Sequence, residues 1–218
     1  MAAGKHAIPF DSARACRELG RVDPALKALV RRVPFALTLR PSRSPFEALL
    51  QSIIYQQLSG KAAATIHGRV LDLFPSRARI APAHLLRLSD GKLRGAGVSQ
   101  GKLLALRDLA TKTIEGVVPS YPALRRMEDE DIIEHLTQVR GVGRWTVQML
   151  LMFRLGRPDV LPVDDLGVRH GFKLTYGKRE MPTPKRLLAY GERWKPWRSV
   201  ASWYMWRAVD LHRQENSR

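Results

Sequence analysis

Cysteine is almost absent from this chain, since Cys16 is the only one among 218 residues. One thiol cannot form an intrachain disulfide, and Cys-ligated zinc sites and iron–sulfur clusters need several thiolates. The six histidines show no metal-ligand spacing such as His-x-x-x-His. The sequence therefore has no signature of a Cys- or His-based metal site, and a reducing, cytoplasmic compartment is the expectation.

Long apolar runs are missing as well, and acidic residues are outnumbered. No stretch reaches the roughly 20 apolar residues of a membrane span, and the start, MAAGKHAIPF, lacks the apolar segment of a signal peptide. Lys and Arg number 37 against 20 Asp and Glu, which gives a formal net charge of +17. The basic residues are spread along the chain, so we expect a nucleic acid as the partner and no membrane. Also missing are Gly-x-Ser-x-Gly, a Walker loop and a strand followed by Gly-x-Gly-x-x-Gly.

The apolar residues have helical spacing throughout. In SPFEALLQSIIYQQLSG, Ser44 and Pro45 predict a helix start, Glu47 completes a capping box, and apolar residues recur at i, i+3, i+4, i+7 and i+8. No segment alternates with period two, so we predict one all-α domain over 1–218, in which two lobes are possible. The predicted helices fall within the following ranges: 11–19, 23–32, 44–60, 60–75, 82–88, 99–116, 128–139, 144–155, 165–174, 184–193 and 197–212.

Residues 128–154 are predicted to form a helix, the turn VRGVG and a second helix. Gly141 and Gly143 flank a valine, which lets the backbone turn sharply and expose its amides. Amides at the start of the second helix attract an anion such as a DNA phosphate, and Arg140 and Arg144 add positive charge beside them. The alternative is an ordinary connection between two helices. Spacing alone leaves both interpretations open, and the net charge favours the phosphate.

Two acids, Asp164 and Asp165, stand before the predicted helix that starts at about residue 165. One of them can cap that helix, which leaves the other to be explained. A poorly solvated carboxylate near a Trp-rich region could stabilise a developing positive charge, although packing and capping alone remain an alternative. The tryptophans of the C-terminal region are either core residues or the walls of a pocket for a flat, cationic base. They stand at positions 194, 197, 203 and 206.

The segments LTQVRGVGRWTVQML, LPVDDLGVRHGF and GERWKPWRSVASWYMWRA, in this order, resemble the helix–hairpin–helix DNA glycosylases, and in particular their 3-methyladenine DNA glycosylase II branch. PFEALLQSIIYQQLSGKAA and VSQGKLLALRDLA extend the resemblance, which covers about residues 40 to 210. The resemblance implies a two-lobed all-α fold with the active site in the cleft between the lobes. It also implies that the chain has no room for the N-terminal β domain of larger bacterial members.

The activity implied by the resemblance is base excision repair of duplex DNA that contains alkylated purines. The damaged nucleotide is flipped out and its N-glycosidic bond is hydrolysed, with 3-methyladenine as the chief substrate and 7-methylguanine as a further candidate. A positively charged alkylated purine leaves as a neutral base without a proton, so one carboxylate suffices. Bifunctional relatives carry Lys where this chain has Trp145, which implies hydrolysis without lyase activity. Two alternatives stay open, namely a non-catalytic DNA- or lesion-binding protein and a glycosylase for oxidised bases.

The resemblance also assigns roles to single residues. Asp165 matches the catalytic aspartate, and Asp164 fits a structural acid that caps the helix. The implied substrate pocket consists of Trp145, Met149, Leu166 and Trp206. The implied DNA-binding residues are Gln57, Ser99, Lys102, Arg140, Gly141, Gly143 and Arg144. Gln57 occupies the position of the wedge that fills the space left by the flipped base, where an apolar residue is common. No cofactor is required, although Na+ or K+ is implied at the hairpin. Its ligands would be the carbonyls of Thr137, Val139 and Val142. A monomer is expected.

Overall fold

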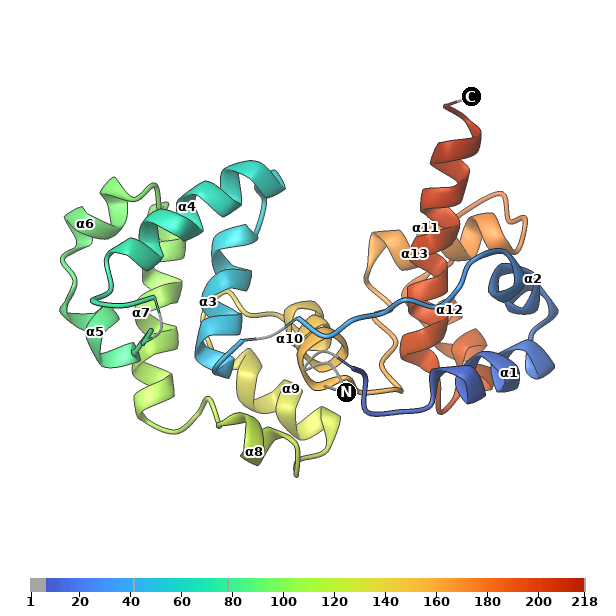
Figure 1. The fold of residues 1–218 in the computed structure, drawn as a ribbon, viewed down its shortest axis with the longest axis horizontal. Coiled ribbons are helices and arrows are strands. Elements are labelled where there is room, and N and C mark those ends of the chain that lie inside the picture. Colours follow the sequence, from blue (N-terminus) through green and yellow to red (C-terminus); the bar gives the residue numbers. More distant parts are fainter. Residues whose placement is uncertain (1–6, 41, 78, 218) are drawn as a thin grey trace, which may run out of the picture. The chain divides into compact units, whose positions relative to one another are not determined.

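The computed structural model describes residues 7–40, 42–77 and 79–217, and within these ranges the regular structure is helical with no strand (Figure 1). The all-α prediction is confirmed. The elements are α1 (Ser12–Val22), α2 (Pro24–Arg32), α3 (Pro45–Tyr55), α4 (Gly60–Asp72), α5 (Pro82–Arg87), α6 (Asp90–Gly95), α7 (Gln100–Ile114), α8 (Tyr121–Leu124), α9 (Asp129–Thr137), α10 (Arg144–Leu150), the π-helical η1 (Leu151–Leu155), α11 (Leu166–Thr175), α12 (Pro184–Gly191), the 3-10 turn η2 (Glu192–Trp194) and α13 (Arg198–Glu215). In the part of the chain that the structure covers, no helix combines the length and apolarity that a membrane crossing needs.

The chain divides into two compact units. One comprises the described residues of 1–41 and 148–218, and the other those of 42–147. The first, which we call the terminal unit, is therefore built from both ends of the chain. The second, the central unit, is continuous in sequence and contains α3 to α9.

The central unit has its core along α3 and α7. The apolar stripe predicted on α3 is buried, with every member at most 2% exposed. Its members are Phe46, Leu49, Leu50, Ile53 and Ile54. Ser44 caps α3 by accepting a hydrogen bond from the Glu47 amide at 3.2 Å, as predicted. The Glu47 carboxylate, however, accepts from the Arg43 amide at 3.0 Å, one residue before the cap.

The end of α3 differs from the prediction. The pattern extends the helix to Gly60, but α3 ends at Tyr55, and Gly60 is the first residue of α4. The backbone leaves the helix at Gln56, whose ψ of 133° is extended, and Gln57 then adopts a positive φ of 56°, in the left-handed region. Residues 56–59 consequently form a separate turn, which we call the Gln57 turn. The short helices α6 and α8 were not predicted either, since six and four residues are too few to show a period.

The terminal unit is organised around α13, the long C-terminal helix, with α11 packed against it (Figure 1). Three of the C-terminal tryptophans are core residues, since Trp194, Trp197 and Trp203 are 0%, 9% and 7% exposed. For these three, the packing alternative is correct. Trp206 is only partly buried and has a different environment, described below.

A buried carboxylate ties the two ends of the chain together within the terminal unit. Asp23 is 1% exposed and caps α2 through the amides of Ala25 and Leu26. It also accepts hydrogen bonds from the hydroxyl of Tyr176 at 2.6 Å and from Nε1 of Trp194 at 2.9 Å. Burial raises the pKa of Tyr176, and the adjacent Asp23 raises it further. Asp23 is therefore a structural acid, and this role was not predicted from the sequence.

Candidate functional site

Asp165 stands directly before α11 and is its N-cap. One of its oxygens, Oδ1, accepts a hydrogen bond from the Val168 amide at 2.8 Å, and the residue is only 9% exposed. The prediction that Asp164 caps this helix is wrong, because Asp165 is the residue next to the first helical position and its side chain takes the free amide. Asp164 is exposed. The capping role thus belongs to the same residue that the resemblance marks as catalytic.

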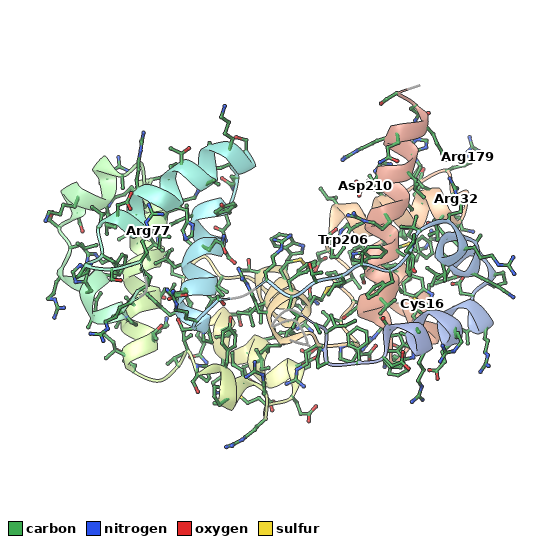
Figure 2. The ribbon with its side chains drawn as sticks, viewed as in Figure 1. Cys16, Arg32, Arg77, Arg179, Trp206 and Asp210 are labelled. Carbon is green, nitrogen blue, oxygen red and sulfur yellow. The ribbon has the colours of Figure 1, made fainter. Side chains whose placement is uncertain are left out.

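A second donor holds the Asp165 side chain. Nε1 of Trp206, on α13, donates to Asp165 Oδ1 at 2.9 Å (Figure 2 labels Trp206). The Trp206 ring stacks on Phe153 of η1, with ring centroids 5.7 Å apart and an interplanar angle of 27°. The Arg40 guanidinium carbon lies 5.0 Å from the centroid of the Phe153 ring. This aromatic stack fixes the indole that orients the carboxylate.

Gly167 makes room for the pairing of Asp165 with Trp206. A Cβ at this position would lie 2.8 Å from Cδ1 of Trp206 and 3.1 Å from Oδ1 of Asp165. Any larger residue at 167 would therefore push the indole away from the carboxylate. Neither Gly167 nor Phe153 was predicted from the sequence. Gly167 stands in the segment DDLGVRHGF, two residues after Asp165. Its role could not be predicted, because it depends on the Trp206 ring, 39 positions later in the chain.

The arrangement around Asp165 has a clear chemical capacity. An amide and an indole N–H orient one carboxylate in a largely buried position, so its charge is poorly screened by water. Such a preorganised negative charge can stabilise a cation that develops near it far better than a surface acid can. Among the described residues, no group of three or more His, Cys, Asp or Glu side chains could hold a metal ion.

The predicted hairpin is present between α9 and α10, but its two glycines differ. Gly141 has a φ of 76°, which non-glycine residues rarely adopt. Gly143 has no positive φ, and a Cβ added there would meet nothing within 4 Å. The turn therefore requires glycine at 141 only. At 143 the missing side chain leaves open space beside the first amides of α10, which is what the approach of a phosphate needs.

An ion pair on α7, between Asp108 and Lys112, binds the backbone of this hairpin at two residues. Oδ2 of Asp108 accepts a hydrogen bond from the Arg140 amide at 2.7 Å. Nζ of Lys112 donates to the Gln138 carbonyl at 2.6 Å and lies 3.2 Å from both carboxylate oxygens of Asp108. The pair fixes the hairpin backbone and keeps the Asp108 charge neutralised beside a predicted anion site. From the sequence alone, Asp108 and Lys112 are indistinguishable from an ordinary i, i+4 ion pair on a helix surface.

The Gln57 turn is held by α7 as well. Nζ of Lys102 donates to the carbonyls of Ile54 and Gln56, at 2.7 and 2.8 Å, and thereby caps the end of α3. Burial lowers the pKa of this ammonium group. Ser99 caps α7 by accepting from the Lys102 amide at 3.4 Å. The DNA contacts expected of Ser99 and Lys102 stay predictions. In the structure both side chains make hydrogen bonds to the backbone of the central unit.

Gln57 is an exposed residue in an unfavourable backbone conformation. A non-glycine residue at positive φ costs about 1–3 kcal/mol and persists only where its surroundings impose it. Here Lys102 fixes the preceding carbonyls, and Nε2 of Gln56 donates to the Gly141 carbonyl at 2.8 Å. Strain of this kind is concentrated at functional sites, which agrees with the wedge role that the resemblance implies.

The remaining predicted residues lie in the two units separately. In the central unit, Arg144 pairs with Glu130, Arg140 is exposed and Trp145 is 45% exposed. In the terminal unit, Leu166 is 65% exposed and Met149 is partly buried. A single pocket formed by Trp145, Met149, Leu166 and Trp206 stays a prediction.

Of the three carbonyls predicted to hold a cation, that of Thr137 belongs to the last residue of α9, and those of Val139 and Val142 lie in the hairpin turn. The Val139 carbonyl already accepts the Val142 amide at 3.0 Å. Neutral carbonyl oxygens are the donors that hard cations accept, so the chemistry of the set fits Na+ or K+. The neighbouring carbonyls of Gln138 and Gly141 are taken by Lys112 and Gln56.

Known proteins resemble this chain over almost its whole length. It is 34% identical to DNA-3-methyladenine glycosylase 1 of Schizosaccharomyces pombe over 212 residues, which cover 95% of this chain and 92% of that protein. The structure of a DNA-3-methyladenine glycosidase from Bacillus halodurans matches with a TM-score of 0.84 and 36% identity, covering 97% of this chain and 95% of that one. The S. pombe 3-methyladenine DNA glycosylase in complex with abasic DNA matches with a TM-score of 0.77 and 34% identity, covering 89% and 95% of the two chains.

The family assignment follows from these matches together with a family-level one. Residues 50–196 match the family described as "HhH-GPD superfamily base excision DNA repair protein". This range includes the Gln57 turn, the hairpin and Asp165, so the elements described above lie inside the matched region. The chain therefore belongs to the HhH-GPD superfamily of base excision DNA repair proteins.

Proposed function

We propose that this protein is a DNA glycosylase that hydrolytically excises alkylated purines, chiefly 3-methyladenine, from duplex DNA. The observation that carries the proposal is the buried Asp165 carboxylate, oriented by the Val168 amide and the Trp206 indole. The similar proteins from S. pombe and Bacillus halodurans are named as a 3-methyladenine glycosylase and glycosidase and have nearly the same length, which supports the same substrate class.

The proposed reaction needs one carboxylate. The bond between C1′ of the sugar and the purine nitrogen breaks, and its electron pair neutralises the positive charge of the alkylated base. Asp165 stabilises the sugar cation that develops and orients the attacking water. The water oxygen bonds to C1′ and its proton is lost, so the products are a free neutral base and an abasic site.

The DNA-binding role belongs to the central unit. The amides at the start of α10 bind a phosphate, with Arg140 and Arg144 beside them, and Gln57 enters the base stack when the damaged nucleotide leaves it. No cofactor takes part. A Na+ or K+ ion at the carbonyls of Thr137, Val139 and Val142 would supply positive charge near that phosphate. We propose further that the protein acts as a cytoplasmic monomer.

A panel of lesion oligonucleotides tests the proposed reaction directly. Duplexes with 3-methyladenine, 7-methylguanine, hypoxanthine or 8-oxoguanine are incubated with excess protein, and the released base is quantified by chromatography. We expect release of 3-methyladenine and no release of 8-oxoguanine. If no base is released while damaged DNA is still bound, the protein is a lesion-binding protein and not an enzyme.

Replacing Gly143 by alanine is expected to weaken DNA binding by about tenfold, because a Cβ would occupy the space through which a phosphate reaches the amides of α10. Damaged and undamaged duplexes should lose affinity equally, since a phosphate contact carries no sequence information. Fluorescence anisotropy with both duplexes measures the effect. Gly68→Ala is the control, because a Cβ there also meets nothing within 4 Å. A loss restricted to damaged DNA would contradict the phosphate role.

The reaction is expected to leave the DNA strand intact. Trp145 offers no amine for a Schiff base with the sugar, so borohydride should trap no covalent adduct with lesion-containing or abasic duplex. A bifunctional glycosylase run in parallel shows that trapping works under the same conditions. A trapped adduct of this protein would replace the proposal with a glycosylase/lyase mechanism.

A further inference from the structure

A single side chain connects the Gln57 turn to the hairpin inside the central unit. Nε2 of Gln56 donates a hydrogen bond to the carbonyl of Gly141 at 2.8 Å. Gln56 directly precedes the residue with positive φ, and Gly141 is the glycine whose positive φ makes the hairpin turn. The bond therefore joins the residue next to Gln57 to the glycine of the hairpin, 85 residues away in sequence.

Helix α7 supports both turns along one face. Lys102, Ala105, Asp108 and Lys112 follow one another at intervals of three, three and four residues, which places them on the same side of a helix. Lys102 holds the Gln57 turn, and Asp108 and Lys112 hold the hairpin. A Cβ added at Gly141 would lie 3.4 Å from Cβ of Ala105, so the hairpin packs closely on this face.

We infer that Gln56 is a positioning residue that couples the wedge, Gln57, to the phosphate-binding hairpin. It acts by fixing the Gln57 backbone relative to Gly141, so that a duplex held by the hairpin is presented to the wedge in one register. Its amide N–H is directed to a backbone carbonyl, so it serves the alignment of two turns and not the recognition of a base. This inference rests on the proposed function, because it assigns Gln56 to base flipping in that reaction.

The variants that test the coupling separate the hydrogen bond from the bulk of the side chain. Gln56→Glu keeps the length of the side chain, but a carboxylate cannot donate to the Gly141 carbonyl. Gln56→Ala removes the side chain, Gln57→Ala removes the wedge, and the double variant removes both. Gln214→Ala is the matched control, because it removes an exposed glutamine from α13. Urea unfolding of each variant measures stability.

The rate of 3-methyladenine release is measured under single-turnover conditions, from a duplex and from single-stranded DNA, where no partner strand has to be opened. We expect both Gln56 variants to slow release from the duplex by about tenfold or more and to leave release from single strands unchanged. Affinity for undamaged duplex and the urea midpoint should match those of Gln214→Ala. The double variant should be no slower than Gln57→Ala, since Gln56 acts through its neighbour.

Three results would overturn the inference. Additive losses in the double variant would mean that Gln56 acts independently of Gln57. A lowered urea midpoint with equal losses on single and double strands would mean that Gln56 only stabilises the unit.

A duplex with 2-aminopurine beside the lesion reports base flipping without chemistry. If wild type raises its fluorescence but releases no base, the proposed enzyme activity fails, and loss of that rise in Gln56→Glu still supports the coupling. An unchanged rise in Gln56→Glu rejects it.

Discussion

Replacing Asp165 by asparagine is expected to lower the single-turnover rate of 3-methyladenine release by about 10²–10³-fold, the range seen when a preorganised electrostatic group is lost. The negative charge that would stabilise the sugar cation disappears, whereas the shape of the side chain stays. Asparagine is as good an N-cap as aspartate, and its oxygen can accept the same bonds from the Val168 amide and the Trp206 indole. The loss should therefore appear in the rate and not in stability.

The neighbouring acid provides the matched control for this experiment. Asp164→Asn makes the same chemical change one residue earlier in the same loop, at an exposed position that does not cap α11. Its rate should stay close to that of wild type. Binding of both variants to a duplex with an uncleavable lesion analogue is measured alongside. Equal rates for Asp165→Asn and Asp164→Asn would remove Asp165 from the mechanism, even if the protein proves to be a glycosylase.

The pair of acids shows what the sequence could and could not specify. The sequence predicted the loop, the helix that follows it and the presence of an N-cap, because these depend on neighbouring residues. It did not determine which acid caps, since both precede the helix closely enough. Trp206 is the second donor to the Asp165 carboxylate, and that contact joins residues 41 positions apart. The capping error arose because capping and chemistry were assigned to separate acids, whereas Asp165 has the position for both.

In the central unit too, features set by neighbouring residues were predicted, and features set by contacts between distant residues were not. The periodic stripe on α3 predicted its buried face correctly, since the pattern itself encodes the helix. The end of α3 was misplaced because it is held by a distant residue, Lys102 on α7, which donates to the carbonyls of Ile54 and Gln56. Asp108 and Lys112 were passed over for the same reason. Their role depends on hairpin carbonyls and amides, whose positions no spacing rule provides.

Replacing Gly171 by alanine is expected to have the largest effect on stability. A Cβ at this position would lie 1.9 Å from the carbonyl oxygen of Met205 and 2.5 Å from its carbonyl carbon. Both contacts are with backbone, which cannot rotate away as a side chain can. Helices α11 and α13 would have to separate, and overpacking of this kind costs about 3 kcal/mol or more. For a protein of this size, that lowers the thermal midpoint by about 10 °C.

Gly20→Ala in α1 is the matched control in the same unit, because the three atoms nearest to its Cβ would all belong to Lys27, at an ordinary 3.5 to 3.7 Å. It should be neutral or stabilise the protein by up to about 1 kcal/mol, since alanine favours helix. Gly171→Ala should also lose activity, because Trp206 directly follows Met205 and would move away from Asp165 together with α13. This combined loss distinguishes it from Asp165→Asn, which should stay stable. Thermal unfolding and base release are measured on the same preparations, and a Gly171→Ala midpoint equal to that of Gly20→Ala would contradict the close helix contact.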